Sequence, residues 1–306
     1  MIRILGTIFA GLLGLAFGSF LNVCLSRWPI GESVVKPRSH CRQCNRTLTW
    51  WENVPLVSWL ALRGRCRTCH AWIGWRYPLV EALVAALWAN EAWCALFISF
   101  GHNPRFISAI AAAYLPRLIF IWLLIALACL DAENFWLPNW ITLPGIALGF
   151  VYSILYFLAV DFARRLPESG FSDFIVYSFL NRSSFLFDLI PDWFIGVIVP
   201  AGLILLIRWV YWLIRRREGI GLGDAILMAL LGAWLGLPGA LLAFVLGVVL
   251  GALVALGQLT FPAARNQSRR WAFGKLPLGT FLCIGGIVSS LWGQAILNAY
   301  LRWGGF

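Results

Sequence analysis

Two aspartates at the ends of apolar stretches are the residues best suited to chemistry in this chain. Asp131 closes the stretch "LLIALACLD", and Asp224 opens another stretch within "GIGLGDAILM". The whole chain has only 13 Asp and Glu residues, and a carboxylate in hydrocarbon costs several kcal/mol. An acid in such surroundings is therefore a candidate functional residue.

Two carboxyl groups brought together can share one proton, because like charges at short range oppose ionisation of both. The ionised member takes a proton from water as the water attacks a peptide carbonyl, and the protonated member stabilises the developing oxyanion. Gly221 and Gly223 suit such a site, because glycine lets backbone approach a substrate closely. Asp224 by itself is equally explained as a helix N-cap. A second acid at matching depth favours a catalytic pair of Asp131 and Asp224, with Gly221 and Gly223 supporting it.

Membrane helices must position these acids. Of the 306 residues, 61% are hydrophobic and 12% are charged, and the mean hydropathy is +0.81. This is too apolar for a soluble domain. Apolar runs of about 20 residues, long enough to cross a bilayer, recur along the chain. We expect them near 4–26, 77–99, 107–130, 140–160, 193–213, 224–238, 240–261 and 277–300. The composition predicts an all-α polytopic membrane protein with about eight transmembrane helices, the sixth and seventh separated by a turn at 236–239.

The net charge of +11 is explained by topology. Basic residues gather after the first, fifth and seventh spans, in the segments 27–76, 215–217 and 265–275. With eight spans these segments lie on one side, which the positive-inside rule makes the cytoplasm. The helix ends that carry Asp131 and Asp224 fall on the same side, so the two acids can be neighbours. Nucleic-acid binding is not needed to explain the charge and is not predicted.

A polar insert after the first span carries a second signal. The motifs "CRQC" and "CRTC" are two C-x-x-C pairs separated by residues 45–65. This spacing is typical of a zinc ribbon, in which two turns each supply two thiolates to a tetrahedral Zn²⁺. The expected ligands are Cys41, Cys44, Cys66 and Cys69.

A closed Cys₄ site has no coordination position left for substrate, so the zinc is expected to be structural and to fold a small zinc-ribbon-like insert on the cytoplasmic side. His40 and His70 flank the pairs, but four cysteines already complete the site. A redox-active cysteine pair is the alternative. Disulfides are not expected, because the cytoplasm is reducing.

These motifs together resemble the bacterial type IV prepilin peptidases, the bifunctional leader peptidase/N-methyltransferases. "GIGLGD" is similar to the G-x-G-D signature of intramembrane aspartyl proteases, and the zinc-bearing loop resembles that of the family almost throughout. The resemblance spans nearly the whole chain apart from 161–192. The similar segments are 17–29, 31–83, 130–144, 218–236 and 275–286.

The resemblance implies that Asp131 and Asp224 are the catalytic aspartates and that the four cysteines bind metal. It also implies that the substrates are prepilins and pseudopilins, which interact with membrane lipid through an apolar helix that follows a short basic leader. Such an enzyme cuts after the glycine that ends the leader, at the cytoplasmic face of the bacterial inner membrane. Bifunctional members then methylate the new N-terminus with S-adenosylmethionine. The residues that bind this methyl donor are not predicted.

Three domains are expected: a first transmembrane helix at 1–27, a zinc-binding insert at 28–76 and a transmembrane aspartyl protease domain at 77–306. The last contains an outer loop at 161–192, which is longer than is usual in the family.

Individual positions also depart from the family pattern. Asn139 replaces a frequent aspartate, and Ile226 and Arg65 each replace a frequent lysine. Methyl transfer rests on the resemblance alone, because no G-x-G-x-x-G turn opens a helix after a strand.

Two other functions remain open from the residues. A transporter would use its intramembrane acids as a proton or cation relay, but such acids are expected near mid-membrane rather than at helix ends. A non-catalytic assembly scaffold would dock through the zinc ribbon, but it leaves the paired aspartates unexplained.

Overall fold

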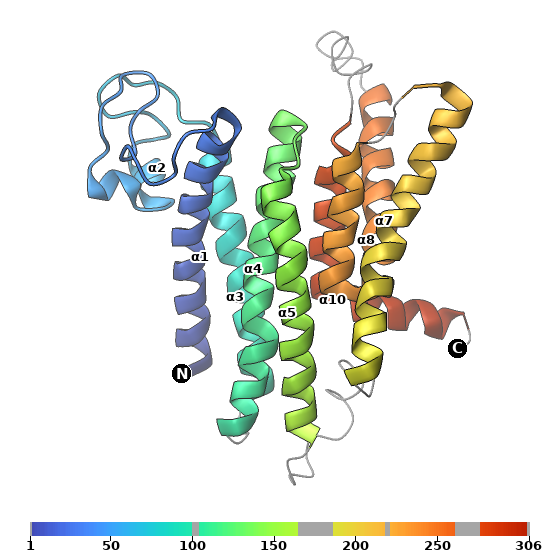
Figure 1. Cartoon of the computed structure of the whole chain (residues 1–306). Coiled ribbons are helices and arrows are strands. Elements are labelled where there is room, and N and C mark those ends of the chain that lie inside the picture. The colour runs from blue at the N-terminus through green and yellow to red at the C-terminus, as the bar shows by residue number, and fades with distance from the viewer. Residues whose placement is uncertain (1, 100–103, 165–185, 218–220, 261–275, 305–306) are drawn as a thin grey trace. The chain divides into compact units, whose positions relative to one another are not determined.

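The structure, a computed structural model, describes residues 2–99, 104–164, 186–217, 221–260 and 276–304. Within those residues it contains helices and two isolated β-bridges but no strand, which confirms the all-α prediction. The elements are α1 (Ile2–Arg27), η1 (Trp28–Ile30), η2 (Trp50–Asn53), α2 (Val57–Ala61), α3 (Arg76–Ser99), α4 (Pro104–Asn134), α5 (Asn139–Arg164), α7 (Leu186–Arg215), α8 (Leu222–Thr260) and α10 (Leu278–Trp303). The α-helices are labelled in Figure 1.

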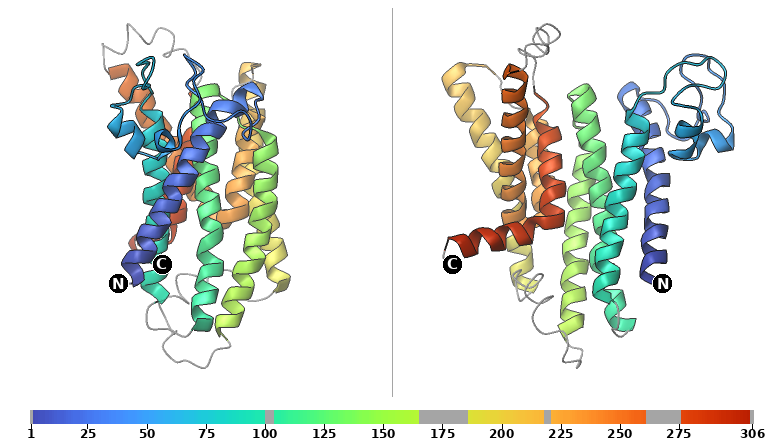
Figure 2. Two further views of the ribbon diagram at one scale, coloured as in Figure 1. Left: turned by 90° about the vertical axis from the view of Figure 1, so that its left-hand side faces the viewer. Right: turned by 180° about the vertical axis from the view of Figure 1, so that it is seen from behind.

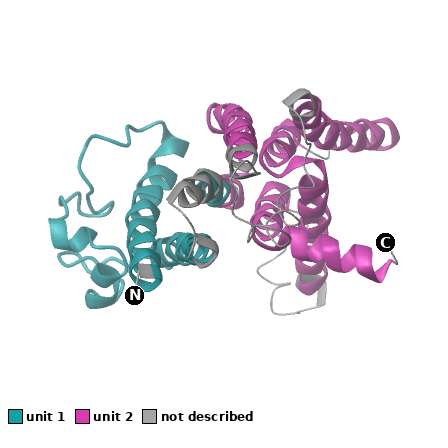
Figure 3. Cartoon of the chain, turned by 90° about the horizontal axis from the view of Figure 1, so that it is seen from below, with its two compact units in different colours: residues 1–126 teal, residues 127–306 magenta. Residues whose placement is uncertain are grey.

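The chain forms two compact units, residues 1–126 and residues 127–306 (Figure 3). The first holds α1, the polar insert, α3 and most of α4, and the second holds the end of α4 and all later helices. The three domains expected from the sequence were divided where apolar and polar segments alternate, whereas the two units are divided by contacts between residues. The three domains therefore stay a prediction. Most of the expected outer loop, 165–185, lies outside the described residues, while α5 and α7 each extend into its edges.

Seven helices in the described part of the chain are long and apolar enough to cross a membrane. They lie at Arg3–Ile30, Arg76–Leu96, Tyr114–Asn134, Asn139–Leu158, Ile190–Arg215, Leu222–Gly257 and Leu278–Trp303. The fold is therefore that of a multi-pass helical membrane protein. Large apolar side chains on the outer helix faces, such as Phe9 at 63% exposure, are the surface that lipid would cover.

The predicted sixth and seventh helices both lie within α8, which accounts for the difference between seven and eight. Gly236 interrupts α8 with φ 69° and ψ 178°, a left-handed conformation that glycine adopts readily. The interruption falls in the turn predicted at 236–239. The part of α8 before Gly236 is about 21 Å long at 1.5 Å per residue, short of the roughly 30 Å of a hydrocarbon core.

The two parts of α8 run antiparallel (Figures 1 and 2). The second part packs along α10 in the opposite direction: Gly247 lies against Leu282, and the Ser289 hydroxyl donates to the Gly239 carbonyl at 2.8 Å. The break at Gly236 thus returns the chain toward the end of the bundle at which α8 began. That end also carries the start of α10.

Small residues let the helices approach closely where they cross. A Cβ added at Gly14 of α1 would lie 2.7 Å from the Ala85 Cα of α3. A Cβ at Gly232 of α8 would overlap the Gly196 carbonyl of α7. In lipid, where no hydrophobic force drives helices together, such close backbone packing is a main source of association energy.

We predict that Gly232→Ala destabilises the second unit, because a methyl group has no space beside the Gly196 carbonyl. Overpacking typically costs about 1–3 kcal/mol, which lowers the melting temperature in detergent by several degrees. Gly202→Ala is the matched control, since a Cβ there meets nothing within 4 Å. Equal melting temperatures for the two variants would contradict this packing.

Candidate functional site

Asp131 lies in the last turn of α4 and is held by the first turn of α10. Its side chain is buried, with 6% exposure. The Oδ2 atom accepts a hydrogen bond from the Thr280 backbone N–H at 2.6 Å and lies 3.0 Å from the Thr280 hydroxyl. That hydroxyl also lies 3.1 Å from the Ala128 carbonyl. One oxygen of Asp131 is thus anchored by a neighbouring helix, and this fixes the orientation of the carboxylate.

The start of α10 can reach Asp131 only because residue 279 is glycine. A Cβ at Gly279 would lie 2.9 Å from Asp131 Oδ2 and 3.0 Å from Leu137 Cδ1. Leu137 also packs at Gly223, where a Cβ would lie 3.2 Å from the Leu137 Cβ. Gly223 and Gly279 therefore bring the start of α8 and the start of α10 against the same side chain, next to Asp131.

Asp224 is the third residue of α8, so it lies in the first turn and not at the preceding N-cap position considered from the sequence. Its carboxylate hydrogen-bonds the backbone of Gly221, and its Oδ2 would lie 3.6 Å from a Cβ at that glycine. The helix dipole favours an anion in this turn. Asp224 therefore has a local helix-capping contact as well as its place beside Asp131.

The two aspartates are neighbours. The charge of Asp131 acts on Asp224, and the buried thiol of Cys283 in α10 experiences both charges. Asp131 and Asp224 are thus brought together, as the sequence predicted, from the end of α4 and the start of α8. An anchored carboxyl group beside a second, partly exposed one is an arrangement that can activate water and stabilise an oxyanion.

Gly279 and Thr280 were not among the residues singled out from the sequence. Both lie in the segment 275–286, which resembles a family segment, but nothing in its residue pattern indicates a chemical role. A threonine in an apolar helix is ordinarily explained by a hydrogen bond to its own helix. Only the structure places its backbone N–H and hydroxyl against an acid about 150 residues earlier in the chain.

The four predicted metal ligands come together in the insert of the first unit. The sulfur atoms of the cluster lie within 4.8 Å of one another, with Cys41 and Cys69 at 3.7 Å and Cys44 and Cys66 at 4.0 Å. Four sulfurs bound tetrahedrally to zinc at about 2.3 Å lie about 3.8 Å apart. The arrangement therefore fits a Cys₄ zinc site, and neither flanking histidine belongs to the cluster.

Two equivalent turns shape this cluster. After each second cysteine a residue with positive φ reverses the chain, Asn45 with φ 55° and His70 with φ 54°. The Asn45 N–H donates to the Cys41 carbonyl at 2.9 Å, and the His70 N–H donates to the Cys66 carbonyl at 3.0 Å. This repetition is the paired-turn pattern that the C-x-x-C spacing predicted.

Backbone donors favour the thiolate form at Cys66. The N–H groups of Cys69 and Thr68 point to its sulfur and lower the pKa of the Cys66 thiol, whereas burial and the neighbouring cysteine side chains raise the pKa of Cys69. Zinc binds thiolate rather than thiol, so this donor pattern suits a metal ligand.

An ion pair between Arg46 and Glu52 stabilises the segment that connects the two cysteine turns. Arg46 donates to Glu52 at 2.5 Å, and the Thr49 N–H and hydroxyl each donate to the same carboxylate at 2.8 Å. The Arg46 contact and the Thr49 donors lower the pKa of Glu52 from 4.5 to about 2. The pair therefore stabilises the insert fully above pH 4.5, and this contribution is lost as the pH falls toward 2.

Comparisons with known proteins match both units. A family model described as the bacterial peptidase A24 N-terminal domain matches residues 12–95, and one described as the type IV leader peptidase family matches residues 118–256. No solved structure matches the chain.

Three curated relatives are each named prepilin leader peptidase/N-methyltransferase. The relative from Pseudomonas putida is 33% identical over 97% of this chain and 94% of its own length. The one from Pseudomonas aeruginosa is 31% identical over 96% and 93% respectively. The relative from Myxococcus xanthus is 35% identical over 81% of this chain, which spans 63% of that relative's length.

We predict that the purified chain binds one zinc ion through the cysteine cluster. Cys44→Ser or Cys69→Ser removes one of four thiolates and should lose most of the metal, because the remaining three leave the site open. Cys94→Ser, in α3 and outside the cluster, is the control and should keep its zinc. Metal content by mass spectrometry decides. Full zinc occupancy in the Cys44→Ser protein would refute the assignment.

Proposed function

Because the chain belongs to the type IV leader peptidase family, we propose that Asp131 and Asp224 are the catalytic pair of its peptidase. Membership in this family makes the chain an enzyme of prepilin processing, a peptidase and an N-methyltransferase. The observation that supports the assignment of the pair is that Asp224, in the first turn of α8, lies near enough to the anchored Asp131 to be affected by its charge.

In the proposed mechanism the two carboxyl groups share one proton. The ionised group removes a proton from water as the water attacks the carbonyl carbon of the leader glycine. The protonated group donates to the oxygen on which negative charge develops, and the same proton then passes to the leaving amine. Thr280 holds Asp131 in place during these steps, and Gly221 and Gly223 keep the approach to Asp224 free of side chains.

The zinc insert takes no part in hydrolysis in this proposal. Cys41, Cys44, Cys66 and Cys69 would hold a zinc ion with four thiolates, and such a set would leave no position for the attacking water. The role of the ion is to fold an insert that has few buried apolar residues of its own. S-adenosylmethionine supplies the methyl group for the second activity, which leaves the donor as S-adenosylhomocysteine and releases a proton from the amine.

The proposed substrates are prepilins and pseudopilins that lie in the lipid of the bacterial inner membrane. The apolar helix after the cleavage site supplies most of the affinity, at about 25 cal/mol per Å² of apolar surface buried. The basic segments of the chain support a cytoplasmic position for the insert and the aspartates. These basic segments repel a basic leader, so electrostatic attraction is not expected to contribute to the affinity for the substrate.

The transporter and the scaffold gain no support from the comparisons, which match peptidase families in both units. Asp131 and Asp224 also lie in the terminal turns of their helices, where a leader enters and leaves more readily than at mid-membrane.

We predict that Asp131→Asn or Asp224→Asn lowers leader cleavage at least about a thousandfold, because each change removes one partner of the acid–base pair. Asp192→Asn is the matched control, since Asp192 is an exposed acid of the same unit at the start of α7, and it should cleave normally. Cleavage of a purified prepilin by membranes containing each variant gives the rates. All three variants should retain zinc, and an Asp131→Asn or Asp224→Asn enzyme with wild-type activity would contradict the proposal.

We predict a smaller loss for Thr280→Val, which keeps the backbone N–H but removes the hydroxyl near Asp131. A hydrogen bond to a charged group contributes about 1.5–3 kcal/mol, so kcat should fall by about 10- to 150-fold with little change in KM. The pH dependence of kcat should shift, and Thr280→Ser should restore both. Thr142→Val is the control, because the Thr142 hydroxyl contacts only carbonyls nearby in sequence. A Thr280→Val enzyme that matches this control would exclude the positioning role.

A further inference from the structure

Three tryptophans form a cluster on the surface of the insert, where α3 begins. The ring centroids of Trp59 and Trp75 lie 4.5 Å apart, and that of Trp72 lies 5.9 Å from each. Gly64 permits this packing, because a Cβ there would lie 2.8 Å from both Trp59 and Trp72. Trp72 and Trp75 remain 55% and 66% exposed although they pack together. Exposed apolar surface that is held in a fixed arrangement indicates an interaction site.

The cluster continues the lipid-facing side of α3. The Leu79 N–H donates to the Trp75 carbonyl at 3.2 Å, so Trp75 belongs to the first helical turn. Trp75, Leu79 and Leu83 are four residues apart and therefore share one face of the helix, and all three are exposed. The span predicted for α3 begins at Arg76. Trp75 thus lies where this face leaves the hydrocarbon, and tryptophan is enriched at that level in membrane proteins.

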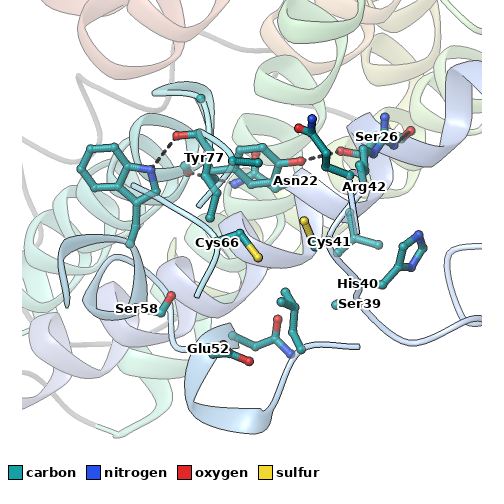
Figure 4. A pocket seen from close by; sticks show the side chains of 18 of the residues that line it. Asn22, Ser26, Ser39, His40, Cys41, Arg42, Glu52, Ser58, Cys66 and Tyr77 are labelled. Carbon is teal, nitrogen blue, oxygen red and sulfur yellow. Dashed lines mark hydrogen bonds between the residues drawn. The ribbon is translucent and has the colours of Figure 1, made fainter. Parts of the chain in front are cut away.

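Polar contacts fix the insert against the ends of α1 and α3. The Arg42 guanidinium donates to the Ser26 carbonyl of α1, and the Ser26 and Tyr77 hydroxyls lie 3.2 Å apart (Figure 4). The Trp59 indole N–H donates to the Ile73 carbonyl at 3.0 Å. The insert lies beside the end of α1 rather than beyond it, and α2, which carries Trp59, forms its lower edge in Figure 1. The tryptophans therefore have a set position at the level where the spans end.

Arginines border the tryptophans. Arg63 and Arg65 flank Gly64, the residue on which two of the rings pack. Arg65 also forms an isolated antiparallel bridge with Trp72, and residues paired in this way project their side chains to the same side. Both arginines are exposed, and in the part of the chain that the structure describes neither guanidinium has a hydrogen-bond or ion-pair partner. Their charge is thus available to an external anion.

The insert as a whole favours an anionic surface. Residues 28–76 contain eight Lys and Arg but only two acids, Glu32 and Glu52, and Glu52 is buried in its pair with Arg46. Four thiolates with one Zn²⁺ would contribute a charge of about −2, which leaves the insert positive. The indole N–H groups of Trp72 and Trp75, also without partners among the described residues, can donate to lipid carbonyl or phosphate oxygens.

Together these residues form one surface, here called the tryptophan surface: Trp59, Trp72, Trp75, Arg63 and Arg65. We propose that the tryptophan surface docks onto the headgroup region of the membrane that α3 spans, with its arginines on the phosphates of anionic lipids. A protein partner would be the other occupant, but the surface adjoins the lipid-facing side of α3 and carries the charge that anionic headgroups attract. The proposal does not depend on the peptidase or methyltransferase chemistry.

The test uses the full-length, zinc-loaded protein in lipid nanodiscs that contain a phospholipid with a photoreactive headgroup. Mass spectrometry measures lipid labelling of residues 57–75, with labelling of the spanning helices as the internal standard. Each arginine near an anionic surface strengthens binding about fivefold. We therefore expect labelling in the wild type to be at least about fivefold higher in discs with phosphatidylglycerol than in purely zwitterionic discs.

Two double variants separate the aromatic from the charged contribution. Trp72→Ala with Trp75→Ala should lower the labelling at least about fivefold in both kinds of disc, because two large apolar side chains are lost. Arg63→Gln with Arg65→Gln should remove the difference between the two kinds of disc. Trp50→Ala is the matched control, since Trp50 is a 78% exposed tryptophan of the insert that lies outside the cluster. One zinc ion retained by each variant shows that the insert is folded.

Three results would overturn the proposal. Zinc-loaded double variants that are labelled like the wild type would show that the tryptophan surface does not contact lipid. A Trp50→Ala protein that loses as much labelling as the tryptophan double variant would assign the contact to the insert in general. If lipid leaves the surface unlabelled, and addition of a purified prepilin protects Trp72 and Trp75 from hydroxyl-radical oxidation, the partner is a protein.

Discussion

A carboxylate in an apolar helix bundle needs hydrogen-bond donors, and this requirement organises the second unit. Asp131 obtains its donors from the Thr280 N–H and hydroxyl, so α10 must begin beside the end of α4. This approach requires glycine at 279, where any side chain would collide with the carboxylate. The position of one acid thus determines where a helix nearly 150 residues later in the chain must start.

Helix α8 keeps the start of α10 beside Asp131 and brings Asp224 to the same end of the unit. The second part of α8 holds α10 through close contacts at Gly247 and Ser289. The first part carries Asp224, and the break at Gly236 lets both parts reach the end of the bundle where Asp131 lies. The short part of α8 before Gly236 places Asp224 in its first turn and then ends within the bundle. A full transmembrane helix in its place would carry the chain to the opposite end of the bundle.

The features that could be predicted from the sequence are those that depend on residues close together in the chain. The C-x-x-C pairs gave the metal cluster, hydropathy gave the long helices, and the glycines and proline at 236–239 gave the break in α8. The meeting of Asp131 and Asp224 was predicted from topology, because charged loops fix which helix ends share a side. The role of Thr280 was not predicted, since it depends on a contact between distant segments that no spacing reveals. Helices α5 and α7 are longer than the apolar runs expected at 140–160 and 193–213. Hydropathy predicts the part of a helix that crosses the membrane, but backbone hydrogen bonding can continue into polar residues beyond it.

The central claim is that Asp131 and Asp224 act as one unit, and a double-mutant cycle on leader cleavage tests it most directly. Residues that share one proton in one step lose their function together, so removing the second after the first has little further effect. We expect the Asp131→Asn, Asp224→Asn double variant to cleave a prepilin at the same residual rate as either single variant, with zinc still bound. A double variant whose loss is the product of the two single losses would show that the aspartates act independently, and it would contradict the account.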